Sequence, residues 1–108
     1  MSVTILALIK INEDEPAALA QYLAITMPLL DRVGAEVLKR FSIASAHIGE
    51  PPSMAIFIEY PNRAAIRTVF NSPEYREIID VRDRAFLQYD TSIVAQKDDT
   101  AIAKSDTK

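Results

Sequence analysis

The amino-acid sequence predicts one α+β domain built from four strands and two long helical segments. The chain has 108 residues, of which 49% are hydrophobic and 25% charged, and this is the size and composition of a single globular domain. Residues 3–11 and 53–60 are apolar on both faces, as expected of strands that are covered on both sides. Residues 16–33 and 62–86 carry apolar side chains at helical spacing. These patterns predict a packed core of sheet and helices.

The first strand is expected over residues 3–11, which are rich in β-branched side chains. Pro16 opens the first helix, because a proline at the first helical position gives up an N–H that has no partner there. Pro28 is expected to kink this helix or tighten its middle, and Gly34 is a natural left-handed stop after Val33. The apolar stripe of the helix consists of Leu19, Tyr22, Leu23, Thr26, Leu30 and Val33.

The second and third strands are expected over residues 35–46 and 53–60. The intervening segment, residues 47–52, contains one glycine and two prolines, which interrupt strand pairing. The third strand is apolar on both faces, which favours a central place in the sheet.

The second helical segment begins at Asn62, a plausible cap, and is interrupted at residues 71–74. Ser72 and Pro73 then restart a helix that runs to about Phe86. The last strand is expected over residues 87–95, where one face is apolar and the other polar. Its inward face is predicted to hold Leu87, Tyr89, Thr91, Ile93 and Ala95. Residues 1–96 are therefore expected to form the domain, and residues 97–108 a polar, disordered tail.

The order strand, helix, strand, strand, helix, strand is the split βαβ pattern of ferredoxin-like folds with an antiparallel sheet. Both helices would cover one face of the sheet. Since the first and third strands are apolar on the other face as well, that face needs a cover. A second copy of the chain is the economical cover, so the sequence predicts a homodimer.

Several classes of function are disfavoured by composition. The net charge is −3 and the only adjacent basic pair is Lys39-Arg40, so neither nucleic acid nor an anionic membrane surface is an expected partner. The chain has no cysteine, one histidine and two glycines, which argues against a metal site, a disulfide or a glycine-rich nucleotide site; no cofactor is predicted. The apolar run at residues 3–9 is too short to span a membrane and lacks a basic leader, so a cytoplasmic location is expected.

One stretch of the sequence resembles a known family. Residues 71–75 (Asn-Ser-Pro-Glu-Tyr) followed by residues 81–83 (Val-Arg-Asp) resemble the signature of the domain of unknown function 1330 family, and the resemblance covers roughly residues 3–95. The spacing of Tyr22, Pro28 and Gly34 and the run Glu59-Tyr60-Pro61 also resemble that family. The resemblance implies a dimeric α+β barrel, in which two ferredoxin-like sheets face each other. It implies a fold and a place for a pocket, because the wider group includes cofactor-independent monooxygenases, isomerases and haem enzymes.

Arg82 is the first candidate for a catalytic role. It shares a predicted core-facing stripe with Tyr75, Ile78, Ile79 and Phe86, and an arginine on such a stripe must be paired or must line a cavity. Its planar guanidinium could hold a carboxylate or enolate oxygen of a small ligand. The structural alternative is an internal ion pair, for instance with Glu59 or Glu36.

His47 is the second catalytic candidate, because imidazole is the side chain that titrates near neutral pH. It could act as a general base or as an axial haem ligand, and the alternative is a solvated loop histidine. Aromatic side chains on inward positions are the candidates for ligand binding. They are Tyr22, Phe41, Phe57, Phe70 and Tyr75, each of which could instead be an ordinary core residue.

These candidates lead to one functional hypothesis and two alternatives. In the hypothesis, a homodimer binds a small organic acid or aromatic compound in a pocket between sheet and helices, with His47 near the mouth and cofactor-independent chemistry of a monooxygenase or isomerase type. The first alternative is a non-catalytic interaction or regulatory module in which Arg82 is structural. The second is a haem-binding barrel, which requires His47 to point into a large apolar cavity.

Overall fold

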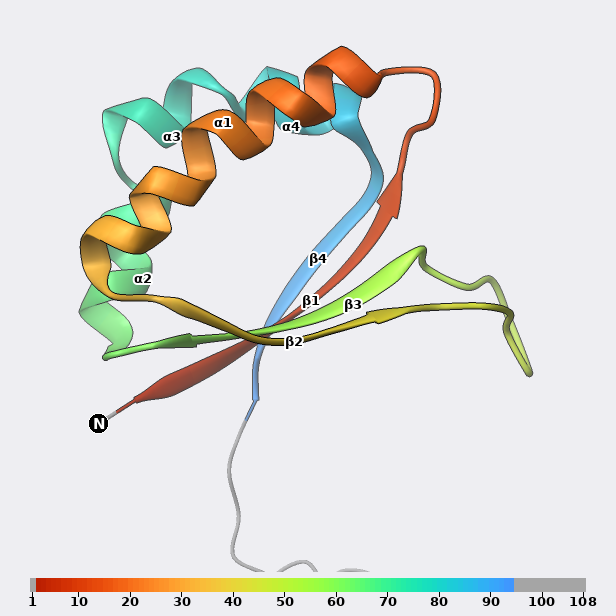
Figure 1. Ribbon diagram of the computed structural model, residues 1–108, viewed down its shortest axis with the longest axis horizontal. Helices are drawn as coiled ribbons and strands as arrows, with labels where there is room; N and C mark the ends of the chain where they lie inside the picture. Colours follow the sequence, from red (N-terminus) through yellow and green to blue (C-terminus); the bar gives the residue numbers. More distant parts are fainter. Residues whose placement is uncertain (1, 95–108) are drawn as a thin grey trace, which may run out of the picture.

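The computed structural model of the protein describes residues 2–94. One antiparallel four-stranded sheet has the strand order β2-β3-β1-β4, and all helices lie against one of its faces (Figure 1). This is the ferredoxin-like βαββαβ arrangement that the sequence predicted. The elements in chain order are β1 (Val3–Ile11), α1 (Pro16–Val33), β2 (Glu36–Ser42), β3 (Met54–Tyr60), α2 (Arg63–Phe70), α3 (Pro73–Glu77), α4 (Ile79–Ala85) and β4 (Phe86–Val94).

The two faces of the sheet follow from the alternation of side chains along its central strands. Ile5, Ala7 and Ile9 of β1 are buried against the helix layer. Leu6 and Leu8 therefore point to the opposite face, where the strand register sets them beside Phe57 and Ala55 of β3. We call the face formed by Leu6, Leu8, Ala55, Phe57 and Phe41 the outer face. In Figure 1 no helix or strand within residues 2–94 covers it.

The helix ends form where the sequence predicts them. Gly34 has φ of +77°, and its N–H and that of Ala35 donate to the carbonyl groups of Asp31 and Leu30, which closes the end of α1. The side chain of Asn62 accepts a hydrogen bond of 2.8 Å from the backbone N–H of Ala65, at the start of α2. Ser72 does the same for the N–H of Tyr75 at 3.1 Å, at the start of α3. Pro28 lies within α1, which continues through it from Pro16 to Val33.

Two predicted boundaries are corrected by the structure. The second strand ends at Ser42 rather than at residue 46, and residues 43–53 form the connection to β3. The helix predicted over residues 73–86 is two short helices that meet at Ile78, and Phe86 already begins β4. The chain has to turn here from the helix layer into the sheet, and helical periodicity does not show that turn.

Several side chains predicted to be buried are exposed, among them Ile79 of α4 at 36% and Ile93 of β4 at 45%. Leu23 of α1 is 44% exposed, because the buried side of this helix is centred on Ala18, Tyr22, Thr26 and Leu29. Leu87 is 65% exposed, because the pairing of β1 with β4 shifts register between Lys10 and Ile11. The predicted tail, residues 97–108, and the last predicted strand residue, Ala95, lie outside the described residues. None of the helices in residues 2–94 is long and apolar enough to cross a membrane.

Candidate functional site

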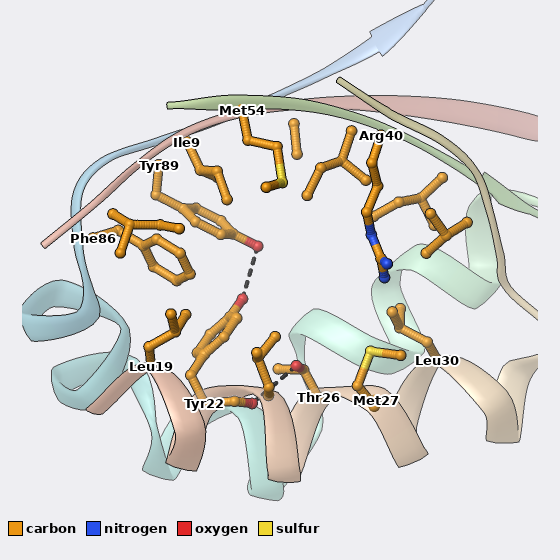
Figure 2. Close-up of a pocket in the computed structure, with 16 residues that line it drawn as sticks. Ile9, Leu19, Tyr22, Thr26, Met27, Leu30, Arg40, Met54, Phe86 and Tyr89 are labelled. Carbon is orange, nitrogen blue, oxygen red and sulfur yellow. Dashed lines mark hydrogen bonds between the residues drawn. The ribbon is translucent and has the colours of Figure 1, made fainter. Parts of the chain in front are cut away.

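A cavity of about 400 Å³ lies between α1 and the helix-facing side of the sheet (Figure 2). Helix α1 packs closely against α2, α3 and α4 and less closely against the strands, so long side chains and the cavity fill the space above the sheet. Sixteen residues line it, and most of them are apolar. From α1 they include Leu19, Tyr22, Thr26, Met27 and Leu30, and from the strands Ile9, Arg40, Met54, Phe86 and Tyr89.

One end of the cavity is formed by tyrosine hydroxyl groups. The hydroxyl of Tyr22 (α1) lies 2.8 Å from that of Tyr89 (β4) and 3.0 Å from that of Tyr75 (α3). The ring of Tyr22 packs edge-on against the rings of both. Arg82 (α4) donates from Nη1 to the Tyr75 hydroxyl at 3.3 Å. We call Tyr22, Tyr75 and Tyr89 the tyrosine cluster; four segments of the chain meet around it.

Burial keeps the hydroxyl groups of Tyr22 and Tyr89 protonated. Loss of hydration raises the pKa of both well above the ordinary value, and the electrostatic influence of neighbouring tyrosines raises both further. Partial burial lowers the pKa of Arg82, but its hydrogen bond to Tyr75 and its electrostatic interactions with Tyr75, Asp83 and Tyr22 together outweigh burial, and the net change in pKa is upward. At neutral pH the hydroxyl groups of Tyr22 and Tyr89 are therefore neutral, and the positive charge of Arg82 lies close to the cluster.

Arg40 occupies the other end of the cavity. It lies on β2 opposite Ile56 of β3, and Figure 2 shows its guanidinium pointing into the cavity beside Leu30. Neither of the two salt bridges within residues 2–94 involves Arg40. A cation without a paired carboxylate, next to an apolar cavity, can bind an anionic group of a ligand.

Sequence reasoning did not select Arg40, and the reason is a register shift. Val37 pairs with Ile58 and Arg40 with Ile56, so both point to the helices although they are three positions apart, an odd number. Strict alternation from Val37 would have sent Lys39 to that side and Arg40 to the outer face. The shift between Val37 and Lys39 exchanges them, and no glycine or proline in the strand announces it. Tyr89 was also not selected, although the alternation of its strand placed it on the inward face.

The structure brings together three of the predicted site residues. Tyr22 lines the cavity, whereas Tyr75 and Arg82 lie behind it; Tyr75 is hydrogen-bonded to Tyr22, and Arg82 to Tyr75. Phe70 packs edge-on against Tyr75, with ring centroids 4.9 Å apart, and is not part of the lining. The predicted ion pair of Arg82 with Glu59 or Glu36 is not formed; its polar partners are Tyr75 and, at 3.5 Å, the exposed Asp83.

The other candidates lie elsewhere. Phe41 and Phe57 form an edge-on pair on the outer face, so their predicted location between sheet and helices is wrong. His47 is exposed in the loop between β2 and β3 and does not line the cavity, so the requirement of the haem hypothesis is not met. The catalytic roles proposed for His47 and Arg82 stay predictions. Among residues 2–94, no group of three His, Cys, Asp or Glu side chains is placed to hold a metal ion.

Solved structures that resemble the chain share its fold at low sequence identity. A protein of unknown function from Rhodopseudomonas palustris, RPA0582, is 22% identical with a TM-score of 0.77, over 90% of this chain and 83% of that one. A dimeric protein of unknown function with a ferredoxin-like fold from Bacteroides fragilis is 14% identical with a TM-score of 0.54, over 88% and 96% of the two chains. A Bacteroides thetaiotaomicron protein provisionally named an antibiotic biosynthesis monooxygenase is 16% identical with a TM-score of 0.59, over 88% and 89%.

No curated protein matches the chain. A family profile does match it, over residues 4–96, which include all the elements described above except the first residue of β1, Val3. This confirms the resemblance seen in residues 71–75 and 81–83. The chain belongs to the DUF1330 family, a domain of unknown function.

Proposed function

We propose that the protein is a homodimer that binds a compact, largely apolar organic acid in the cavity between α1 and the sheet. The observation that carries this proposal is the arrangement of the lining: a cation at one end, neutral hydroxyl groups at the other, and apolar side chains between them. A volume of about 400 Å³ lies in the range of cavities that bind small molecules. An apolar cavity also costs packing contacts, which a ligand would restore.

The acid group of the ligand is assigned to Arg40. It is the only charged side chain of the lining, so no carboxylate there competes for its guanidinium. A planar guanidinium can donate two parallel hydrogen bonds to one carboxylate, which fixes the orientation of the ligand as well as adding affinity. Arg40 is also exposed, so it marks the mouth of the cavity. A ligand would enter there with its apolar end first and its acid group last.

The homodimer is supported by the outer face. Phe41 is 47% exposed there, and Leu6, Leu8 and Phe57 are only partly covered in one chain. Contiguous apolar surface of this kind marks an interface, and a second copy of the same face is complementary to it by twofold symmetry. The Bacteroides fragilis neighbour with this fold is described as dimeric. A cytoplasmic location is part of the proposal and is supported by the lack of cysteine.

Two kinds of activity fit such a binding site. The similarity of fold to a protein provisionally named a monooxygenase supports monooxygenase chemistry on the bound acid as the first candidate. The hydrogen bond from Arg82 to Tyr75 favours a supporting role for this arginine, and therefore the second candidate, a binding protein without catalysis. Both candidates require the same ligand site, so binding is the property to test first.

The test is native mass spectrometry of freshly purified protein with 3-(4-isopropylphenyl)propanoate as the probe, followed by calorimetric titration. We expect a dimer that retains two probe molecules. Arg40→Ala is expected to weaken binding about tenfold, because a charge-assisted hydrogen bond is lost. Arg67→Ala, which removes an exposed arginine of α2 far from the lining, is the matched control. Absence of binding, or equal binding by wild type and Arg40→Ala, contradicts the proposal.

A further inference from the structure

The hydrogen bonds of the tyrosine cluster run in one direction, from Arg82 toward the cavity. A guanidinium group only donates, so the Tyr75 oxygen accepts from Arg82. Tyr22 donates its single hydroxyl hydrogen to Tyr89. In the contact of 3.0 Å between Tyr22 and Tyr75, the hydrogen must therefore come from Tyr75. The chain of donation is Arg82 to Tyr75, Tyr75 to Tyr22, and Tyr22 to Tyr89.

Tyr89 stands at the end of this chain with its own hydrogen unused. Its oxygen accepts from Tyr22 at 2.8 Å, and within residues 2–94 Tyr89 donates in no hydrogen bond of 3.5 Å or less. Tyr89 lines the cavity, whereas Tyr75 does not, and Figure 2 shows its hydroxyl at the edge of the open space. A donor in such a place normally finds an acceptor, because a hydroxyl withdrawn from water without one costs free energy.

We propose that Tyr89 donates this hydrogen to an acceptor oxygen of the ligand, so that the ligand is an oxo acid with its carbonyl group at the end remote from the carboxylate. This inference rests on the proposed function, which places the carboxylate at Arg40. The chain of hydrogen bonds both sets the direction of donation and strengthens the Tyr89 hydroxyl as a donor. Each donor in it is polarised by the one before, starting from the cation of Arg82, so Tyr89 is a better donor than an isolated tyrosine.

Arg82, Tyr75 and Tyr22 are positioning residues in this scheme. The hydrogen bond from Tyr75 polarises the Tyr22 hydroxyl and so strengthens its donation to Tyr89. Without it, the hydrogen bond from Tyr22 would be weaker, and Tyr89 would be a poorer donor to the cavity. Removing the Tyr75 hydroxyl is therefore expected to change the preference of the site without touching its lining.

The test compares two probes of similar size, 3-(4-acetylphenyl)propanoate and 3-(4-isopropylphenyl)propanoate, in the first of which a carbonyl group replaces the CH and one methyl group of the isopropyl substituent. In wild type we expect the acetyl probe to bind at least as tightly as the isopropyl probe. In Tyr89→Phe the acetyl probe should lose about fivefold or more in affinity, because its carbonyl is buried without a donor, while the isopropyl probe changes little. In Tyr75→Phe the ratio of the two affinities should fall by about two- to threefold.

Tyr60→Phe is the matched control, since it removes another buried hydroxyl that is neither in the cluster nor in the lining. It should leave the ratio of affinities unchanged. The carbonyl stretch of the acetyl probe gives an independent reading: it should shift to lower frequency on binding to wild type and not on binding to Tyr89→Phe.

The outcomes separate the two proposals. If the isopropyl probe binds through Arg40 but Tyr89→Phe weakens both probes equally, or neither, the inference about the carbonyl group is wrong and the acid site stands. If neither probe binds wild type, the proposed function fails and the inference fails with it.

Discussion

Replacing Leu6 with lysine should separate the proposed dimer into folded monomers. Leu6 lies in the middle of the outer face, on central strand β1, between Phe57 of β3 and Ser92 of β4. A twofold interface would bury both copies of the substituted residue, and an unpaired buried ammonium group costs about 3 kcal/mol or more. Two such groups cost about 6 kcal/mol, which raises the dissociation constant roughly ten-thousand-fold. In a single chain the lysine reaches water, so the fold should persist.

Sedimentation velocity at micromolar concentration measures the change in assembly, and far-ultraviolet circular dichroism checks the fold. Ile79→Lys is the matched control, because Ile79 is 36% exposed on α4, in the helix layer on the other side of the sheet. This variant should sediment as wild type does. The reasoning is refuted if Leu6→Lys remains a dimer, or if the wild-type protein is a stable monomer at these concentrations.

Two further predictions concern stability. Burial raises the pKa of Tyr60 to about 12 and also raises the pKa of Tyr22 and Tyr89, so the unfolded chain releases these protons first as pH rises. The free energy of unfolding in urea should therefore hold up to about pH 10 and then fall by up to about 4 kcal/mol per pH unit; a flat profile to about pH 11 would contradict this. Ser72→Ala should lower the free energy of unfolding by about 1 kcal/mol, because the start of α3 loses its cap. Thr68→Ala, which removes a hydroxyl bonded within α2, should cost less, and equal losses would show that the cap is not the cause.

The fold could be predicted from the sequence because local signals and global pattern agree. The strands at 3–11 and 54–60 are apolar on both faces, and Gly34, Asn62 and Ser72 act at the helix ends as their chemistry predicts. The sequence did not predict the break between α3 and α4 at Ile78, but the predicted proximity of Tyr75 and Arg82 does not depend on it. Tyr75 and Arg82 are seven residues apart, close to two helical turns, so they share a side whether or not the helix is continuous.

The site could be predicted only in part, because the identity of a residue does not fix which face of the sheet it occupies. Phe41 and Phe57 lie on strands with apolar residues on both faces, so composition alone could not assign them to the cavity or to the outer face. Arg40 is the opposite case: strict alternation along its strand would place it on the outer face, but a one-residue shift in pairing turns its side chain to the cavity. Register depends on the partner strand, and the partner strand is not visible in a local pattern.

The contrast between the two arginines explains how one small cavity can be polar at both ends. Arg82 was expected to need a partner, and it has one, but the partner is the neutral oxygen of Tyr75 rather than a buried carboxylate. An ion pair with Glu59 or Glu36 would have cancelled its charge. The contact with Asp83 is 3.5 Å long and that side chain is 65% exposed, so solvent screens it. The charge of Arg82 therefore acts through the tyrosine hydroxyls. At the opposite end of the cavity, Arg40 forms no salt bridge within residues 2–94. A ligand that binds both Arg40 and the Tyr89 hydroxyl must carry two separated oxygen functions.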